Sequence, residues 1–288
     1  VFDDLVNQDQ EKNLAKRKFI DLIDKNDLPK FLKNNKKITA IIHMGAISTT
    51  TESNFNKLLI SNIRYSQMLW SWCSANKVPF IYASSAATYG GGENGYDDNE
   101  DSLSKLIPLN AYGYSKHFFD QWVHAQVNSS QPSPPQWCGL KFFNVYGPNE
   151  YHKNRMASVV FHAFQQYQKE KEIKLFKSEN KNYKDGMQLR DFIYVKDAVE
   201  YVMFFLKNTH ISGLFNSGTG TAQSFKELAE AVILNTKGDK ADIKYVDMPN
   251  DLRGKYQYYT EANLDKIKAL GLNLKFKNLQ EGVNDYMK

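Results

Sequence analysis

Tyr112 and Lys116 stand four residues apart in the segment Tyr-Gly-Tyr-Ser-Lys, a spacing that could support acid/base chemistry. On a helix, side chains at this spacing lie on one face, a turn apart. Such a lysine is expected to lower the pKa of the tyrosine, so that the phenol can exchange a proton near neutral pH. The same spacing recurs at Tyr167 and Lys171, which we interpret as an exposed helix pair. The spacing alone is therefore a weak indication.

A serine upstream gives Tyr112 a chemical context. Ser85 lies in the sequence Tyr-Ala-Ser-Ser-Ala-Ala-Thr-Tyr-Gly, an apolar strand pattern that ends in small hydroxyl residues. Open parallel sheets bind their ligands at the carboxyl ends of the strands. An ordinary strand-to-loop turn has a similar composition, but the downstream Tyr112 and Lys116 favour a functional interpretation. We expect the Ser85 hydroxyl to hydrogen-bond both a substrate oxygen and the phenol of Tyr112.

The elements that must position these residues alternate between strand and helix patterns. Apolar runs of strand type occur at 38–43, 79–83 and 139–145, and helical spacing of apolar residues runs through 54–75 and 112–127. Buried strands that alternate with amphipathic helices predict a parallel sheet covered on both faces. Right-handed crossovers make such a sheet doubly wound. We therefore predict an α/β fold built on a Rossmann-like doubly wound parallel sheet.

The regular alternation loosens after about residue 148, where shorter elements and a lysine- and asparagine-rich stretch at 177–186 follow. This change predicts a second, smaller α/β domain that binds the substrate and is interleaved with the first. The predicted dinucleotide-binding domain comprises residues 1–147 and about 191–217. The predicted substrate domain comprises about 148–190 and 218–288.

Composition excludes several classes of protein. Apolar residues make up 42% of the chain, and no apolar run approaches the roughly 18–20 residues that cross a bilayer. The net charge of +5 comes from dispersed lysines, whereas nucleic-acid sites usually show a clustered basic stripe. Cys73 and Cys138 lie beside tryptophans and are expected to be buried thiols of a reducing compartment. We expect no membrane, nucleic-acid or metal partner.

The site residues resemble those of a known superfamily. Ser85, Tyr112 and Lys116 look like the catalytic trio of the short-chain dehydrogenase/reductases, and several segments resemble the extended branch that acts on nucleotide sugars. These segments are 84–90, 112–116, 142–148, 190–195 and 215–220. Together they span nearly the whole chain. Within that branch, the segments 43–52, 152–158 and 251–256 are similar to those of the ADP-L-glycero-D-manno-heptose 6-epimerases.

The resemblance implies an isomerase that inverts carbon six of ADP-D-glycero-D-manno-heptose through transient oxidation by bound NADP. Tyr112 would remove the hydroxyl proton, Lys116 would hold the nicotinamide ribose and lower the Tyr112 pKa, and Ser85 would orient the oxygen. The family uses a lysine after its Asn-Val-Tyr-Gly-Pro motif as a second acid/base, and Lys153 occupies that position. The family also implies a homo-oligomer in a bacterial cytoplasm that supplies lipopolysaccharide precursors.

The resemblance assigns further binding residues. The expected cofactor contacts are Asp3, Asp4, Lys12, Met44, Gly45, Ala46, Ile47, Ser48, Ser61, Lys116, Val145 and Lys153. The expected substrate contacts are Ser85, Asn144, Arg155, His162, Phe176, Lys177, Ser178, Glu179, Arg190 and Tyr256. Arg155 departs from the small residue of the family pattern. Arg190 could bind a diphosphate bidentately or pair with a nearby acid.

The first residues of the chain bear on the choice between NADP and NAD. An acid that ends the second strand of a dinucleotide-binding unit accepts a hydrogen bond from the adenosine ribose, and Asp3 suits this role. Lys12, Lys16 and Arg17 follow and could neutralise the 2′-phosphate of NADP, or could simply be a solvated basic segment. The family is associated with NADP, so we expect NADP, with NAD as the alternative.

The glycine-rich loop of the family should precede Asp3 by about twenty residues. Glycine is absent before Gly45, and the run at 90–92 is followed by a polar loop rather than a helix. We therefore expect an N-terminally truncated chain that binds its cofactor poorly, because that loop supplies backbone donors to the pyrophosphate. We also expect this chain to be unstable, because its sheet lacks the central strand.

Three alternatives remain. One is a 4-epimerase, which has less reason to keep Lys153. Another is a 4,6-dehydratase, which wants an acidic pair where Ala86 and Ala87 stand. The third is a regulator that senses NAD(P) on the same fold without catalysis. Such regulators usually lose the tyrosine or the lysine, and both are present here.

Overall fold

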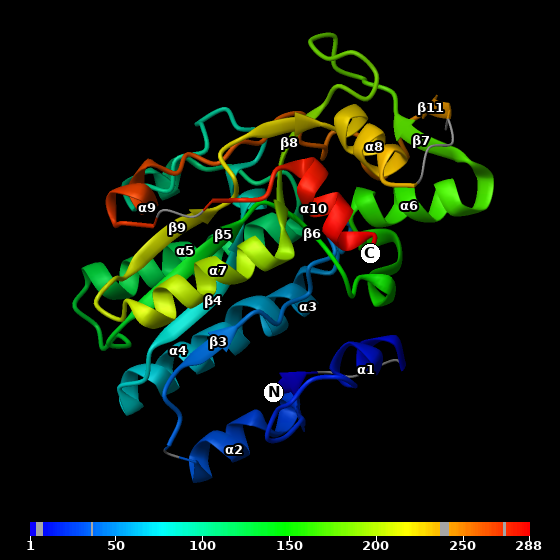
Figure 1. Ribbon diagram of the computed structural model, residues 1–288. Coiled ribbons are helices and arrows are strands. Elements are labelled where there is room, and N and C mark those ends of the chain that lie inside the picture. The colour runs from blue at the N-terminus through cyan, green and yellow to red at the C-terminus, as the bar shows by residue number, and fades with distance from the viewer. Residues whose placement is uncertain (4–7, 36, 237–241, 273–274) are drawn as a thin grey trace.

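A computed structural model describes residues 1–3, 8–35, 37–236, 242–272 and 275–288 (Figure 1). Asp4, an expected cofactor contact, lies outside the described residues. The elements of the first half are β1 (Phe2–Asp3), α1 (Gln8–Leu14), β2 (Ile23–Asp24), α2 (Leu28–Asn34), β3 (Ile41–His43), α3 (Phe55–Leu58), α4 (Tyr65–Asn76), β4 (Phe80–Ser85), α5 (Ala111–Asn128) and β5 (Trp137–Phe142). Those of the second half are β6 (Asn144–Tyr146), α6 (Val159–Glu170), β7 (Glu172–Phe176), β8 (Leu189–Tyr194), α7 (Val195–Lys207), β9 (Gly213–Ser217), β10 (Ala222–Ser224), α8 (Phe225–Leu234), β11 (Asp242–Val246), α9 (Asp265–Ala269) and α10 (Leu279–Tyr286).

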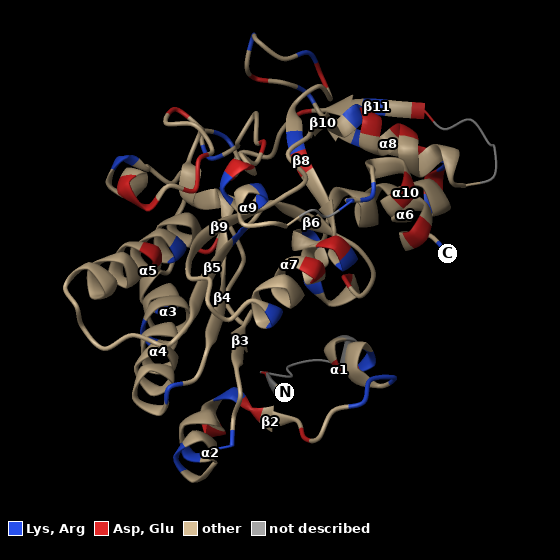
Figure 2. Ribbon diagram, turned by 60° about the vertical axis from the view of Figure 1, so that its left-hand side comes forward, with Lys and Arg blue, Asp and Glu red and all other residues tan. Residues whose placement is uncertain are grey.

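The central sheet has the strand order β3-β4-β5-β9, and every pair in it is parallel. Helices α4 and α5 cover one face and α7 covers the other (Figures 1 and 2). The strands are buried on both sides, which explains their continuous apolar runs: Phe80, Ile81 and Leu140 have no exposed surface. The predicted α/β fold with a parallel sheet covered on both faces is confirmed.

The expected single strand over residues 139–145 is wrong in one respect. The chain leaves the central sheet at Phe143, so that β5 pairs with β9 whereas β6 pairs with β8 in another sheet. At the break, the Phe143 amide donates to Ser217 O and the Val145 amide donates back to Phe143 O. Asn144 and Val145 therefore stand where the two sheets meet. Periodicity could not reveal the break, because the apolar run continues through it.

The second half of the chain builds a smaller unit from the sheet β6-β8-β10, the pair β7-β11 and helices α6, α8 and α10. The described residues form two hydrophobic cores. The first lies on the central sheet and includes Trp70, Phe119, Phe205 and Phe215. The second lies among the smaller sheets and helices and includes Val160, Leu228 and Val283.

The N-terminal segment forms a separate parallel pair, β1-β2, which lies beyond β3 (Figure 1). Among the described strands, β3 pairs only with β4. Helix α1 reaches the other half of the molecule through Asn13, whose amide nitrogen lies 3.2 Å from His152 Nδ1 and 3.4 Å from Asn149 O. The start of the chain thereby contacts the segment that carries Lys153.

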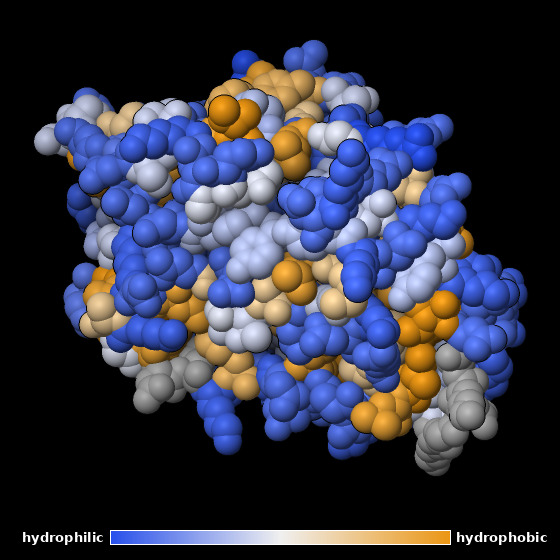
Figure 3. All heavy atoms as spheres, turned by 90° about the horizontal axis from the view of Figure 1, so that it is seen from above, coloured by the Kyte–Doolittle hydropathy of each residue, from blue (hydrophilic) through white to orange (hydrophobic). Residues whose placement is uncertain are grey.

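Lysine and arginine residues are interspersed with acidic ones over most elements, as the dispersed lysines predicted (Figure 2). Seen from the side that is uppermost in Figure 1, the surface is mostly hydrophilic, and its hydrophobic side chains occur in small groups (Figure 3). No helix among the described residues is long and apolar enough to cross a bilayer. Cys73 and Cys138 are buried free thiols, as expected.

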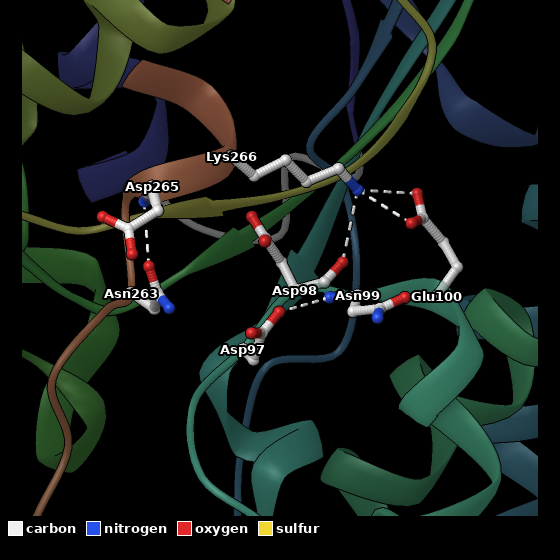
Figure 4. A pocket seen from close by; sticks show the side chains of 7 residues that line it. All are labelled: Asp97, Asp98, Asn99, Glu100, Asn263, Asp265 and Lys266. Atoms are coloured by element: carbon white, nitrogen blue, oxygen red, sulfur yellow. Dashed lines mark hydrogen bonds and ion pairs between the residues drawn. The ribbon is translucent and has the colours of Figure 1, made fainter. Parts of the chain in front are cut away.

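Polar side chains cover the outer edge of β9 (Figure 4). Glu100 accepts a hydrogen bond from the Leu214 amide at 2.8 Å, and Asp98 accepts one from the Asn216 amide at 2.7 Å. Lys266 donates to Leu214 O and pairs with Glu100 at 2.8 Å. An open strand edge would otherwise present unpaired amides for pairing with another chain. The polar residues of this pocket are therefore explained by their hydrogen bonds to the backbone groups at the open edge of β9.

Candidate active site

Ser85 and Tyr112 are brought together by two abrupt changes of chain direction. Ser85 ends β4, and its hydroxyl accepts a hydrogen bond from the Ala87 amide at 3.1 Å, which starts a 3₁₀ turn. Asn110 caps the first turn of α5 by accepting from the Gly113 amide at 2.8 Å. A Cβ on Gly113 would lie 2.8 Å from Ala87 O, so only glycine allows this close approach. The sequence thereby seats the start of α5 against the end of β4.

The side chain of Tyr112 is half-buried and interacts with Ser85. Burial raises the pKa of Tyr112, the hydrogen bond with Ser85 lowers it, and the negative charge of Asp120 raises it further. The net direction is upward, whereas the sequence analysis expected Lys116 to lower it. The physical reason is that loss of hydration disfavours the phenolate.

Lys116 is buried, and its ammonium donates to Ala83 O at 2.8 Å. Burial lowers the pKa of Lys116 to about 8, and the opposing effect of Asp120 holds it up. Among the described residues, Ala83 O is the one acceptor of this ammonium, which leaves two N–H donors at the carboxyl end of β4. These donors suit the hydroxyls of a ribose.

The second Tyr-x-x-x-Lys match is not an exposed helix pair. Tyr167 is 1% exposed in the second core, and Lys171 follows the end of α6 in a left-handed conformation. Its ammonium lies 4.4 Å from the centre of the Tyr167 ring. The interpretation was wrong because Tyr167 faces the second core, where β7 and α8 also contribute side chains.

The segment 44–48, predicted to line the cofactor, follows β3 and is held in place by Asn62. The Asn62 side chain accepts from the Ile47 amide and donates to Ile47 O, both at 2.9 Å, and also donates to the Ser115 hydroxyl. Asn62 and the predicted Ser61 lie in a π-helical turn, residues 59–64, between α3 and α4. Such turns are frequent at functional sites. The loop is thereby fixed to α5, the helix of Tyr112.

The same end of the sheet can accept a nicotinamide cofactor. Gly45 has open space where a Cβ would point, and Met44 is exposed beside it. Val145 is half-buried where the sheets meet, and Lys116 has free donors. The chemistry of these groups, an open apolar loop and an ammonium at the carboxyl ends of parallel strands, fits a nicotinamide and its ribose.

Lys153 lies in the 3₁₀ segment 151–156, where its ammonium pairs with Glu150 at 3.7 Å. Glu150 is buried and also accepts from the Ser158 amide at 3.0 Å and from the Ser158 hydroxyl at 2.6 Å. Tyr286, near the end of α10, donates to it at 3.4 Å. Glu150 therefore ties the Lys153 segment to α6 and α10.

Arg190 is the second residue of β8, and its side chain is buried among aromatic rings. Its guanidinium is 4.9 Å from the centre of the Tyr256 ring and 5.6 Å from that of Phe225. It donates to Leu189 O at 2.8 Å, and none of the described acids pairs with it. Burial lowers the pKa of Arg190. The alternative of an ion pair is not observed, so the guanidinium keeps donors for an anionic ligand.

Three other predicted substrate residues converge on one segment, residues 247–253. Each forms an ion pair with a different residue of this segment, and all six side chains are partly exposed. The pairs are Arg155 with Asp251 at 2.7 Å, Lys177 with Asp247 at 2.9 Å, and Glu179 with Arg253 at 2.7 Å. The segment leads directly into Tyr256, which stacks on Arg190.

The remaining predicted residues lie around this region or apart from it. His162 is in α6, 3.4 Å from Arg155 O, and Phe176 ends β7. Ser178 donates to Asn180 O, and Asn144 lies 3.5 Å from the Thr260 hydroxyl. Ala46 and Ser48 flank Ile47. Asp3 ends β1 and Lys12 is in the last turn of α1, both on the separate N-terminal segment.

Four further residues near the site were not predicted from the sequence: Asn62, Asp120, Lys141 and Glu150. Asp120 could have been found, because it stands four residues after Lys116 and therefore on the same face of α5. Glu150 has a similar signal, since it precedes Lys153 by three residues. Asn62 and Lys141 interrupt apolar patterns without a recognisable spacing. Their partners come from distant segments and become visible only in the fold.

Comparison with known proteins agrees with this geometry. The model of the NAD dependent epimerase/dehydratase family matches residues 1–218. The ADP-L-glycero-D-manno-heptose-6-epimerase of Fusobacterium nucleatum is 48% identical over 297 residues, which cover 100% of this chain and 88% of that protein. The protein of the same name from Nitratidesulfovibrio vulgaris is 42% identical over 291 residues, with the same two coverages.

Solved structures show the same architecture. The ADP-L-glycero-D-manno-heptose-6-epimerase of Helicobacter pylori superimposes with a TM-score of 0.77 at 28% identity, over 96% of this chain and 80% of that one. A dTDP-glucose 4,6-dehydratase from Bacillus anthracis, in complex with NAD, gives a TM-score of 0.76 at 18% identity over 99% and 85% of the two chains, and this likeness concerns the fold alone. The chain therefore belongs to the NAD dependent epimerase/dehydratase family.

Proposed function

We propose that this protein is an isomerase that converts ADP-D-glycero-D-manno-heptose to ADP-L-glycero-D-manno-heptose. The observation that carries the proposal is the joint placement of Ser85, Tyr112 and Lys116, together with 42–48% identity to named heptose epimerases over the whole chain. Ala86 and Ala87 stand where a dehydratase wants acids. The presence of both Tyr112 and Lys116 favours an enzyme over a regulator.

The residues divide the work of proton transfer and binding. Tyr112 takes the proton of the reacting hydroxyl at its phenolic oxygen, and Ser85 orients that hydroxyl by hydrogen bonding. Lys116 offers its free N–H donors to the nicotinamide ribose and its positive charge to the forming phenolate. A bound nicotinamide cofactor supplies reversible hydride transfer. Lys153 acts as acid/base when the sugar presents its other face.

Binding of the nucleotide sugar rests on the second half of the chain. The Arg190 guanidinium, stacked on Tyr256, can hold diphosphate oxygens. Arg155, Lys177 and Glu179 surround the same region, and His162, Phe176, Ser178 and Asn144 complete the proposed contacts. The division into residues 1–147 with about 191–217, and about 148–190 with 218–288, remains part of this proposal. Ala262 and Leu264, which this division assigns to the substrate domain, are also part of the first hydrophobic core.

We infer that the cofactor is NADP. The family establishes a nicotinamide cofactor, and the basic residues after β1, beginning at Lys12, support the 2′-phosphate form. Asp3 is proposed to contact the adenosine ribose. The function further implies a bacterial cytoplasm and a homo-oligomer. Equilibrium binding of NADPH and NADH, measured by the fluorescence of each reduced nucleotide, tests the preference. Tighter NADH binding would overturn it.

The decisive experiment is an epimerisation assay without added cofactor. ADP-D-glycero-D-manno-heptose is incubated with the protein, and the two epimers are separated and quantified. Formation of the L-glycero epimer supports the proposal. A folded protein with bound nucleotide that converts none of the substrate contradicts it and directs the search to UDP- and dTDP-hexoses.

Substitutions assign the two acid/base groups. We expect Tyr112→Phe to lower kcat by ~10² to 10⁴-fold, the usual contribution of a general acid/base, and Lys153→Ala to act in the same direction. Initial rates are measured in both directions from each epimer. Wild-type turnover by Lys153→Ala would exclude its role as second base. An unaffected Tyr112→Phe variant would favour the non-catalytic alternative.

A further inference from the structure

A buried ion pair behind the site has no role in the mechanism above. Asp120 has no exposed surface, and its carboxylate lies 2.9 Å from the ammonium of Lys141, which is 1% exposed. Tyr82 donates to Asp120 at 3.1 Å and Ser84 donates at 2.6 Å. Lys141 also donates to the Thr88 hydroxyl at 2.8 Å. We call these five residues the Asp120 network.

Stability is a poor explanation for this pair. Transfer of two charges from water to a protein interior costs several kcal/mol per ion, and replacement of buried pairs by apolar residues is often neutral or stabilising. The surroundings of Asp120 are a hydrophobic core that includes Phe119 and Val123, so apolar side chains would suit the position. A buried pair in such a place is more readily explained by what it orients.

The Asp120 network joins every element that carries the proposed catalytic trio. Asp120 is on α5, one turn after Lys116 and two turns after Tyr112. Ser84 directly precedes Ser85 on β4, and the Thr88 hydroxyl donates to Ser85 O at 2.9 Å. Lys141 is on β5, three residues before Asn144. The two elements that meet at the Ser85–Tyr112 contact, β4 and α5, are thus both tied to the Asp120 carboxylate.

We propose that Asp120 and Lys141 are the positioning residues of the site: their ion pair fixes α5 to the ends of β4 and β5 and so sets the geometry of Ser85, Tyr112 and Lys116. The inference rests on the function proposed above. Neither residue touches substrate or cofactor in this account. Because a misplacement of about 1 Å can lower a rate by ~10²-fold, the pair contributes to turnover without contributing to the chemistry itself.

The carboxylate also acts on the site electrostatically. The negative charge of Asp120 raises the pKa of Lys116, against the lowering effect of burial, and raises that of Tyr112. Removal of this charge is therefore expected to lower both pKa values. The other titratable groups that face these side chains are His43 from β3, Tyr82 from β4, Tyr89 from the 3₁₀ turn, His117 from α5 and Cys138 from β5.

The test compares a neutralised pair with a matched surface pair. In Asp120→Asn/Lys141→Met both charges are removed together, so that no uncompensated charge is left in the core. We expect kcat to fall by ~10- to 100-fold, KM for the sugar nucleotide to change little, and the pH–rate limbs to move to lower pH. The control is Glu170→Gln/Lys174→Met, which removes an exposed pair of 3.0 Å on α6 and β7 and should leave all three quantities unchanged.

Unfolding curves show what part of any loss is structural. A double variant with wild-type kcat and an unmoved pH profile overturns the proposal, as does a loss that disappears when rates are expressed per folded molecule. If the double variant does not fold, Ser84→Ala decides, because it removes the shorter of the two hydrogen bonds that tie Asp120 to β4 and keeps both charges. Its kcat should fall with the unfolding midpoint retained, and an unchanged kcat overturns the proposal.

A second readout separates this proposal from the proposed function. Lys116 is expected to bind the nicotinamide ribose whatever the sugar, so the pH dependence of the NADPH dissociation constant reports its pKa without turnover. In the double variant this dependence should shift to lower pH. A wild-type protein that binds NADPH but converts no ADP-heptose contradicts the substrate alone. An unshifted dependence in the variant contradicts the role of Asp120.

Discussion

At the scale of single residues, Lys116 holds its charge where the protein disfavours it. The ammonium is buried, has one protein acceptor, and its pKa is lowered from 10.5 to about 8. Near neutral pH the folded state must therefore hold a charge that the unfolded chain holds more easily. Catalytic groups commonly carry such a destabilising burden, because their environment is arranged for the reaction.

We predict that Lys116→Met is more stable than the wild type near pH 7, by up to roughly 3 kcal/mol, and inactive. The sign follows from a lowered pKa: the wild type bears the cost of the buried charge below pH 8, and the cost disappears as pH rises towards 10.5. Urea unfolding at pH 7 and near pH 10.5 measures the difference. Equal stability of the two proteins at pH 7 would contradict the prediction.

The sequence predicts the identity of the catalytic residues better than their ionisation. The spacing of Tyr112 and Lys116, after a strand that ends in Ser85, was sufficient to expect their contact. The upward shift of the Tyr112 pKa was not foreseeable, because it depends on how deeply the phenol is buried. Asp120 was missed for a related reason: three of its partners come from β4 and β5, and sequence spacing relates residues only within one element.

At the scale of elements, strand β9 is completed by side chains instead of by another strand. Asp98 is 3% exposed, and burial raises its pKa to about 6, although the Asn216 amide and Lys266 both oppose the shift. The neighbouring Asp97 raises it further. The carboxylate therefore covers the strand edge at some cost to stability when it is ionised.

We predict that Asp98→Asn stabilises the protein by up to about 3 kcal/mol above pH 6, because an amide oxygen still accepts from Asn216 and bears no charge. A raised pKa means that the folded wild type binds more protons, so its relative stability is highest below pH 3.8 and falls as pH rises through about 6. Urea midpoints of both proteins at pH 4 and pH 8 measure this. A larger gain at pH 4 would show the sign to be wrong.

Element boundaries show where patterns are insufficient. The helices 54–75 and 112–127 were predicted closely, because apolar residues repeat at helical spacing over several turns. The break at Phe143 was not predicted, since one apolar run serves two sheets. Tyr167 was expected on a surface and is buried, because its burial depends on β7 and α8, which come later in the chain.

At the scale of the whole molecule, the described residues form two hydrophobic cores. Leu140 is fully buried in the first core, and Leu228 is 1% exposed in the second. Strand β8 carries residues of both cores, with Phe192 in the second and Ile193 in the first. The preceding residue, Asp191, is buried and accepts hydrogen bonds from Thr219, Gly220 and Ala262.

We predict that Leu140→Ala and Leu228→Ala each cost about 2–5 kcal/mol, the usual range for such a cavity, but in different parts of the molecule. If the two cores are separate domains, Leu228→Ala lowers a calorimetric transition of its own and weakens ADP-sugar binding before NADPH binding. Leu140→Ala has the opposite order. A single transition that both variants shift equally would mean that the chain unfolds as one unit.

Because of the ion pairs of the 247–253 segment, an anionic ligand enters the proposed substrate site by replacing carboxylates that are already there. Arg155, Lys177 and Arg253 are already neutralised by carboxylates before any phosphate arrives, whereas Arg190 is not, so an anionic ligand at these three cations exchanges one counter-charge for another. Dissolved salt weakens the ion pairs within the protein and the new ion pairs with the ligand by similar amounts. Both kinds of pair are exposed and are screened over similar distances. The contribution of these three cations to the affinity for the nucleotide sugar should consequently stay nearly level when the ionic strength changes.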